Sequence, residues 1–120
     1  GCYDVLGNDC CMAILYGRCL EMAKRYNEAF DVYQKANEQT KQAFRPLCQC
    51  SYGYLAHAYL KGIGTEINIE KAKELVLEGI EQYQDKTDCS VLALYAYLAI
   101  KNEKGFSKEK AIKYLTKKFM

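Results

Sequence analysis

Residues 55–72 of this 120-residue chain read LAHAYLKGIGTEINIEKA, and this stretch decides the fold. The segment LAHAY places a large, a small and another large side chain on one face of a helix. The following GIG supplies the backbone freedom that a helix end and a turn need. Asn68 is a preferred N-cap residue and stands directly before a second amphipathic segment. The stretch therefore predicts a hairpin of two helices, the first ending at Gly62 and the second running over about 69–83.

The same arrangement recurs on both sides of this stretch. The small residue of the first helix recurs at intervals of 39 and 40 residues, as Gly17, Ala56 and Ala96. An alanine of the second helix recurs at intervals of 43 and 39, as Ala29, Ala72 and Ala111. A period near forty with paired helices is the signature of an α-solenoid. We therefore expect an all-α chain with a single domain over 1–120, an α-α superhelix of three antiparallel helix hairpins at about 9–43, 46–84 and 88–119.

The expected helices are bounded by short polar or glycine-containing breaks. Pro46 opens the third helix, because its missing N–H is not needed in a first turn. Ser107 is the expected N-cap of the last helix. The predicted bounds are 9–23, 26–43, 46–62, 69–83, 89–101 and 108–118.

The recurring small residue has a physical reason. Two helices approach to about 8–10 Å only where one presents a small side chain. The large neighbours of these residues, Tyr16, Leu55 and Tyr95, are then expected to fill the space between successive hairpins. Tyr54 and Tyr97 lie off this packing row and are expected to be surface anchors.

At these positions the chain resembles the tetratricopeptide repeat superfamily over about residues 10–119. The first hairpin is similar to the plain form of about 34 residues, at Gly17, Leu20, Ala29, Tyr33 and Ala36. The second resembles the longer Sel-one-like variant, with L-A-x-x-Y-x-x-G-x-G followed by N-x-x-K-A. It departs from that variant at Ala56, Thr65 and Leu75-Val76, where Gly, Val and an aromatic pair are usual. The resemblance implies a right-handed superhelix whose first helices line a concave groove, and a role in contacts with other proteins.

Projection of the first helices onto that groove gives the expected partner-binding residues: Arg18, Glu21, Tyr54, His57, Lys61, Tyr97 and Lys101. Met22, Gly53, Leu60 and Ile100 project to the same face. Aromatic, Arg and Met side chains are enriched at peptide-binding interfaces, although a solvated surface accounts for the same residues. We expect a scaffold that binds a peptide or segment of another protein, preferably an acidic or carboxylate-bearing one. Self-association or membership of a longer repeat array is a further expectation, because three repeats are about the minimum for stability.

Charge and hydropathy argue against two other kinds of partner. A formal charge of +2 is too small to indicate nucleic acid, and the seven Lys against two Glu in residues 101–120 fit the solvated face of a last helix. The longest apolar run, Val91–Ile100, is about half the length of a membrane-spanning helix. The chain begins at Gly1 without a basic-then-apolar segment, which favours a cytoplasmic form and leaves a processed, exported form as the alternative.

The seven cysteines are odd in number and contain no CxxC pair. A fully paired disulfide framework within one chain and zinc-type spacing are therefore both excluded. The cysteines are Cys2, Cys10, Cys11, Cys19, Cys48, Cys50 and Cys89. We interpret most of them as small apolar side chains at helix interfaces, with one or two disulfides as the alternative. No metal and no cofactor is expected.

Catalysis would need a convergent set of groups that the sequence does not supply. The chain has a single histidine, His57, for which a solvent-facing or packed role is expected. The GxG at residues 62–64 is interpreted as a turn rather than as half of a phosphate loop. We therefore do not expect an enzyme. The alternative function is a thiol-based enzyme or redox sensor in which Cys10, Cys11 or Cys19 acts with His57, which requires a thiol beside an activating base.

Overall fold

The computed structural model describes residues 9–42, 50–84, 87 and 89–119 of the chain. Over these residues the protein forms six helices and no strand, so the all-α class is confirmed. The helices are α1 (Asp9–Met22), α2 (Tyr26–Gln42), α3 (Cys50–Lys61), α4 (Ile69–Tyr83), α5 (Cys89–Ile100) and α6 (Lys108–Phe119). None of these six helices has the length and apolar character that crossing a membrane requires.

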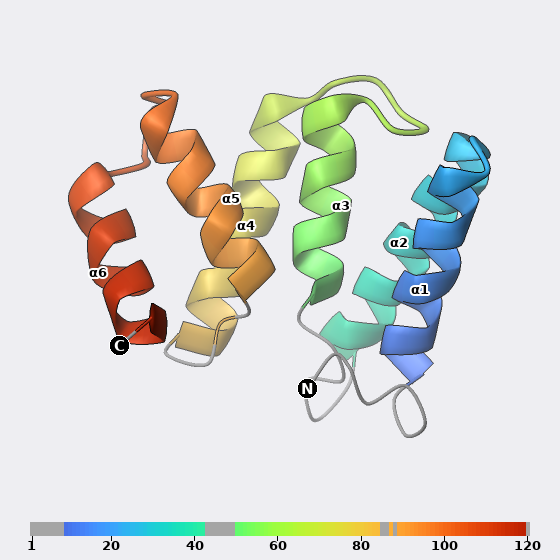
Figure 1. Ribbon diagram of the computed structural model, residues 1–120, viewed down its shortest axis with the longest axis horizontal. Helices are drawn as coiled ribbons and strands as arrows, with labels where there is room; N and C mark the ends of the chain where they lie inside the picture. The colour runs from blue at the N-terminus through green and yellow to red at the C-terminus, as the bar shows by residue number, and fades with distance from the viewer. Residues whose placement is uncertain (1–8, 43–49, 85–86, 88, 120) are drawn as a thin grey trace.

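The helices pair in chain order. α1 packs on α2, α3 on α4 and α5 on α6, and the three pairs follow one another along the long axis of the molecule (Figure 1). α2 also contacts α3 and α4 contacts α5, so each pair is packed on the next. α3 contacts both α1 and α5, which places the first helices of the three pairs side by side. One face of the molecule is therefore built from α1, α3 and α5.

The same kind of turn follows the first helix of each pair. The first helix of a pair is followed by a residue with left-handed backbone, which is Lys24 (φ 64°), Gly62 (φ 73°) or Asn102 (φ 61°). The next N–H then bonds a carbonyl five positions back, from Arg25 to Leu20 at 2.8 Å, from Ile63 to Ala58 at 2.9 Å and from Glu103 to Leu98 at 3.0 Å. This is the Schellman closure of a helix. Only the middle turn uses a glycine at this position, and it is the one that the sequence predicted.

The predicted N-caps of α4 and α6 are confirmed. Asn68 has extended backbone (φ −143°, ψ 90°), and its side-chain oxygen accepts the Lys71 N–H at 3.1 Å. Ser107 Oγ accepts the Lys110 N–H at 3.4 Å. The predicted bounds of α4 and the predicted starts of α1, α2, α5 and α6 are confirmed too, and the C-terminal ends of the other five helices differ from the prediction by one residue. The predicted start of the third helix at Pro46 lies outside the described residues.

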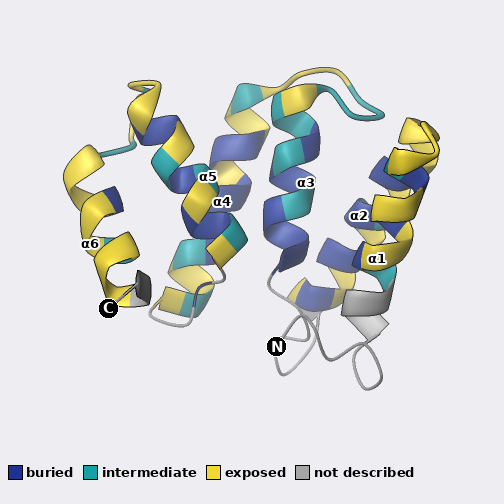
Figure 2. Cartoon of the chain, viewed as in Figure 1, coloured by how far each residue is buried: buried dark blue, intermediate teal, exposed yellow. Residues whose placement is uncertain are grey.

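Small side chains occupy the places where paired helices approach. Ala29 and Ala72 are fully buried, and Ala111 is nearly so. A Cβ atom added at Gly17 of α1 would collide with the Tyr33 ring of α2. The core follows these contacts through the molecule, so that each helix carries buried residues on its inner side and exposed residues on its outer side (Figure 2).

The prediction for Tyr16 is wrong. Leu55 and Tyr95 are buried as expected, whereas the Tyr16 ring is 59% exposed. Tyr95 packs on the Phe106 and Tyr114 rings of its own pair, whereas the described residues give Tyr16 on α1 no such ring contact. Tyr54 is also more than a surface anchor, because its half-buried ring stacks on the buried Tyr33 ring with centres 5.7 Å apart.

Candidate functional site

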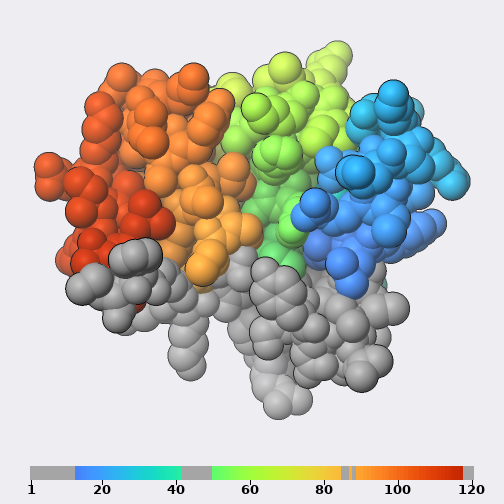
Figure 3. All heavy atoms as spheres, in the orientation of Figure 1, coloured from blue at the N-terminus to red at the C-terminus, as the bar shows by residue number. Residues whose placement is uncertain are grey.

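A cavity of about 560 Å³ extends across α1, α3 and α5, and we call it the α1–α3–α5 groove. Its lining residues are Arg18, Glu21, Gly53, Tyr54, His57, Leu60, Lys61, Ser90, Ala93, Leu94 and Tyr97. Figure 3 shows the face on which α1 (blue), α3 (green) and α5 (orange) lie beside one another. The groove thus draws its side chains from the first helix of every pair.

Helical spacing points the polar lining residues in a common direction. Tyr54, His57 and Lys61 stand at i, i+3 and i+7 on α3, which is one stripe of a helix. Arg18 and Glu21 are three positions apart on α1 and face this stripe. The contact between α1 and α3 therefore brings the two sets of side chains into one site.

The floor of the groove is apolar where α3 and α5 approach. Gly53 is buried, and a Cβ atom added there would lie 2.5 Å from Ser90 Oγ of α5. Leu60 of α3 and Leu94 of α5 are half-buried beside this contact. A ligand side chain can therefore bury apolar surface on these leucines while its polar groups reach the rim.

The α1 wall of the groove is a connected set of aromatic and charged groups. Arg18 Nη1 donates to Tyr54 Oη at 3.0 Å, and its Cζ lies 5.6 Å from the centre of the Tyr54 ring. Tyr33, on which Tyr54 stacks, donates a hydrogen bond from Oη to Glu21 Oε2. Burial, followed by this carboxylate, raises the pKa of Tyr33, and the bond to Tyr54 raises the pKa of Arg18. Arg18 therefore stays cationic, and Glu21 is oriented by a phenol.

The α5 wall is centred on one ring. Lys61 Nζ of α3 lies 5.9 Å from the centre of the Tyr97 ring, and Lys101 Nζ, from the residue just after α5, lies 5.6 Å from it. Two ammonium groups therefore approach one aromatic ring. Such contacts contribute about 0.5–1 kcal/mol at exposed sites. Two positive charges therefore lie beside Tyr97 at this end of the groove.

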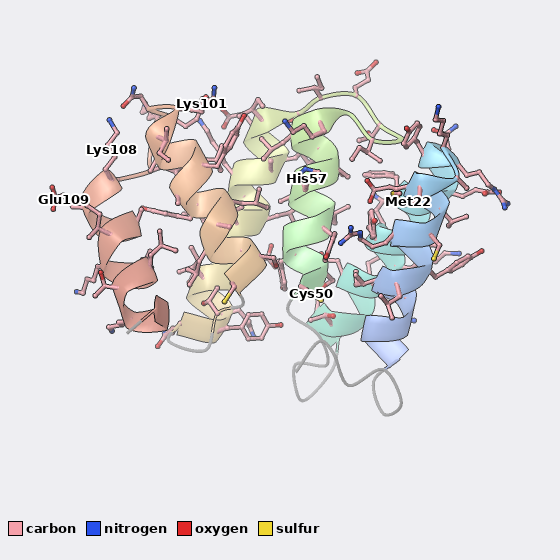
Figure 4. All side chains as sticks on the ribbon, viewed as in Figure 1. Met22, Cys50, His57, Lys101, Lys108 and Glu109 are labelled. Carbon is pink, nitrogen blue, oxygen red and sulfur yellow. The ribbon has the colours of Figure 1, made fainter. Side chains whose placement is uncertain are left out.

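His57 lies between the two walls, at mid-height on α3 (Figure 4). Burial lowers its pKa, Glu21 opposes this effect, and the cations Lys61 and Arg18 lower the pKa further. The imidazole is therefore neutral near pH 7 and offers one donor and one acceptor to a ligand.

The cations of the groove form no ion pair with a carboxylate of the described residues, and Glu21 acts on Arg18 only by raising its pKa. Elsewhere in the molecule, Lys73 Nζ of α4 lies 2.9 Å from Glu103 Oε1. Within the described part of the chain no ion pair involves Arg18, Lys61 or Lys101. Glu21 is the carboxylate among the lining residues, and it accepts the hydrogen bond from Tyr33. The groove therefore carries an excess of positive charge that its own residues do not neutralise.

The structure brings most of the expected partner-binding residues together in this groove. Six of the seven expected partner-binding residues line the cavity, and the seventh, Lys101, contacts the Tyr97 ring at its rim. Gly53 and Leu60 also line it as projected, whereas Met22 and Ile100 are exposed outside the lining. The residues that were missed are Ser90, Ala93 and Leu94. Their spacing of seven, four and three residues before Tyr97 is the signal that could have found them.

The described cysteines do not behave as the predicted apolar fillers. Cys50 is buried and disulfide-bonded, which supports the alternative of one or two disulfides. Cys19 and Cys89 are free thiols on the surface, where helix amphipathicity leaves them unpacked. No cysteine is among the residues that line the groove around His57. The side chains of Cys10 and Cys11 lie outside the described part of the structure.

A second cavity, of about 190 Å³, lies among α2, α3 and α4, and we call it the α2–α3–α4 cavity. Its charged lining residues are Glu38, Lys41, Lys71, Glu74 and Glu78. Lys41 Nζ lies 3.6 Å from Glu78 Oε1, and Tyr52 Oη donates to the same oxygen at 3.4 Å. Charges of both signs therefore compensate one another here.

No family model, curated protein or solved structure matches the chain. The described residues form an all-α protein of three helix pairs, with an aromatic groove whose cations form no ion pair within this part of the chain.

Proposed function

We propose that the protein is an interaction scaffold, an α-solenoid of tetratricopeptide or Sel-one-like hairpins that binds an acidic segment of another protein in the α1–α3–α5 groove. The observation that carries the proposal is that three cations, which form no ion pair among the described residues, converge on the aromatic rings of one groove. Aromatic and Arg side chains around a desolvated centre are the composition of binding hot spots. An anionic ligand supplies the charge that the groove lacks.

The repetition of local structure supports the solenoid arrangement. All three pairs close with the same left-handed turn, at Lys24, Gly62 and Asn102. Every second helix contacts the first helix of the next pair. A stack of this kind presents its first helices as one continuous surface, on which an extended segment can contact all three pairs at once.

The distribution of groups suggests how such a segment binds. Arg18 at the α1 wall and the Lys61–Lys101 pair at the α5 wall each bind a carboxylate of the segment. Exposed charge pairs contribute only about 0.2–1 kcal/mol each. The larger share of the affinity is therefore assigned to burial of a ligand side chain on Leu60 and Leu94, and the charges select for an acidic sequence.

A thiol-based activity has less support. It needs a cysteine beside His57, and the described lining of the groove contains none. Cys19 lies on α1 one position after Arg18, and it is exposed on a different face of the helix.

Fluorescence anisotropy with defined peptides tests the proposal. The probes are a labelled Glu-rich peptide with a free C-terminal carboxylate, its C-terminal amide, and a Gln-for-Glu counterpart. We expect the Glu-rich peptide to bind, the Gln counterpart to bind at least about tenfold more weakly, and the affinity to fall as salt is added. Comparison of the carboxylate with the amide separates recognition of acidic side chains from recognition of a chain end.

The matched variants are Lys61→Ala with Lys101→Ala in the groove and Lys35→Ala with Lys113→Ala outside it. Both pairs remove two exposed lysines, and neither Lys35 nor Lys113 lines the groove. Only the groove pair is expected to lower the affinity for the Glu-rich peptide, by about tenfold. An equal loss of affinity in both pairs would mean that net charge causes the effect, and it would contradict the groove as the binding site.

A further inference from the structure

Glu21 is an exception among the charged residues of the α1–α3–α5 groove, because it is an anion beside cations. The residue is half-buried, and its carboxylate accepts a hydrogen bond from Tyr33 Oη. Within the described chain this is its one hydrogen bond, and no ion pair involves it. A carboxylate offers about four acceptor positions. Most of the acceptor capacity of Glu21 is therefore left for solvent or a ligand.

The nearest cation on α1 is bound to another group. Arg18 stands three positions before Glu21, a spacing at which oppositely charged side chains on a helix can pair. Its guanidinium donates instead to Tyr54 Oη at 3.0 Å. Tyr33, which orients Glu21, is 1% exposed and stacks on the same Tyr54 ring. The two stacked phenols therefore engage the cation and the carboxylate of this wall separately.

Glu21 and the two ammonium groups of the α5 wall stand on opposite sides of His57. Besides burial, which lowers the pKa of His57, Glu21 raises this pKa and Lys61 lowers it, so both charges lie near the imidazole. Lys61 shares the Tyr97 ring with Lys101. The groove thus presents an oriented carboxylate at one wall and two ammonium groups at the other.

We propose that Glu21 is a specificity-determining residue, which binds the ammonium group of a lysine in the partner segment while the Lys61–Lys101 pair binds an acidic side chain of the same segment. The inference rests on the proposed function and narrows the ligand to a segment that carries both charges. Tyr33 is a positioning residue in this assignment, because its buried hydroxyl orients the Glu21 carboxylate from the side of the core.

The width of the groove sets the spacing of the two charges in the ligand. The axes of α1 and α5 are separated by two helix spacings, roughly 16–20 Å, and the side chains of Glu21 and of the two lysines reach into this gap. Four residues of extended chain span about 13 Å, and side chains at i and i+4 lie on one face. A lysine four positions from an acidic side chain therefore reaches both walls.

Attraction by net charge alone predicts the opposite effect of such a lysine. Arg18, Lys61 and Lys101 outnumber the single carboxylate of Glu21 at this groove. A lysine added to an acidic peptide would then weaken binding, because it lowers the negative charge of the peptide. The sign of the effect therefore distinguishes a contact with Glu21 from general attraction.

Fluorescence anisotropy on the full chain measures this sign. The probes are two forms of the Glu-rich peptide, with one lysine four positions before or four positions after the glutamates. Each has a counterpart with norleucine, which keeps an aliphatic side chain and lacks the ammonium group. We expect the lysine peptide of at least one order to bind about threefold more tightly than its norleucine counterpart.

Glu21→Gln keeps an oxygen that accepts the Tyr33 hydrogen bond and removes the charge. In this variant the same lysine peptide is expected to bind more weakly than its norleucine counterpart. Glu81→Gln is the matched control, because Glu81 is exposed on α4 and lines neither cavity. The control should keep the preference for lysine, and circular dichroism checks that both variants are folded.

Tyr33→Phe tests the positioning role. The ring remains in the core, while Glu21 loses the hydroxyl that orients it. We expect the preference for lysine to fall below about 1.5-fold, with less than about a twofold change in affinity for the norleucine peptide. A purely structural role of the hydroxyl would weaken both peptides equally and would contradict the assignment of Tyr33.

Two results would overturn the role of Glu21. One is a pair of norleucine peptides that bind at least as tightly as the lysine peptides in both orders, which would leave the scaffold for acidic segments intact. The other is a preference for lysine that persists in Glu21→Gln, because the ammonium group would then bind elsewhere. Absence of binding by every peptide, the Glu-rich one included, would contradict the proposed function together with this inference.

Discussion

The α1–α3–α5 groove and the α2–α3–α4 cavity both contain lysine, glutamate, tyrosine and leucine side chains, and they differ in how their charges are compensated. In the cavity, Lys41 lies 3.6 Å from Glu78, and further carboxylates are close by. In the groove, Lys61 and Lys101 lie on the Tyr97 ring, and no carboxylate forms an ion pair with either in the described chain. A surface that neutralises its own charges supports packing, whereas one that leaves them uncompensated is prepared for a charged ligand.

Charge reversal gives the largest expected difference between the two places. Lys61→Glu with Lys101→Glu is expected to lower the affinity for the Glu-rich peptide by about 100-fold or more, because attraction is replaced by repulsion at one end of the groove. Lys41→Glu with Lys71→Glu makes the same change of charge at the cavity, and we expect less than about a threefold effect there. Anisotropy titrations of both variants measure this. Similar losses in the two variants would mean that the overall charge of the molecule, and not the groove, attracts the peptide.

Two of the glycines at helix contacts, Gly17 and Gly79, offer a comparison of stability. Gly17→Ala is expected to destabilise the fold by about 1–3 kcal/mol, because the new Cβ meets the buried Tyr33 ring that also orients Glu21. Gly79→Ala meets Tyr52 and Val91 atoms only at ordinary contact distance, 3.4 Å. This second change is expected to be neutral or to stabilise by up to about 1 kcal/mol, through the better helix propensity of alanine. Urea unfolding followed by circular dichroism gives both values, and a Gly17→Ala protein as stable as the parent would contradict the close approach of α1 and α2.

Much of this arrangement was predictable because it depends on local chemistry. The bounds of α4 and its Asn68 cap follow from residue types that have one preferred role. The expected groove residues came from projecting the first helices onto the concave face that the family resemblance implies. The turn at Asn102 also carried a signal, since Asn tolerates left-handed backbone better than most residues, whereas Lys24 carried none.

The remaining features depend on neighbours that a periodic pattern does not identify. Tyr16 has the same place in its helix pair as Leu55 and Tyr95, yet it is exposed and they are buried. The disulfide of Cys50 likewise depends on which thiol the fold brings near. Burial and disulfide pairing are tertiary properties.

Tyr97 allows a sharper test of the α5 wall. Tyr97→Ala is expected to weaken the Glu-rich peptide by about fivefold, because the two lysines lose the ring on which their ammonium groups lie. Tyr97→Phe keeps the ring and removes only the hydroxyl, so the affinity should remain within about twofold of the parent. Anisotropy titrations decide between them. An equal loss in both variants would assign the effect to the hydroxyl instead of the ring.

The smallest expected effect concerns pH and belongs to the groove alone, since no histidine lines the cavity. Burial lowers the pKa of His57 below its ordinary 6.5, with Lys61 and Arg18 adding to the effect and Glu21 opposing it. The fold thus takes up a proton less readily than the unfolded chain does. The stability that the neutral imidazole confers is therefore present above pH 6.5 and decreases as the pH falls through the folded pKa.

Peptide affinity should change in the opposite direction. Protonation adds a cation to the groove, and the carboxylates of a bound Glu-rich peptide favour that proton, so binding is expected to strengthen about two- to fivefold between about pH 7.5 and about pH 5.5. His57→Gln keeps a hydrogen-bonding side chain without the titration and should flatten the profile. Because the chain has one histidine, NMR titration of its ring protons gives the pKa with and without peptide. An unchanged profile in His57→Gln would assign the pH dependence to the peptide. A flattened profile, with a His57 pKa that rises on binding, would place the peptide carboxylates at the centre of the groove, between its two cationic walls.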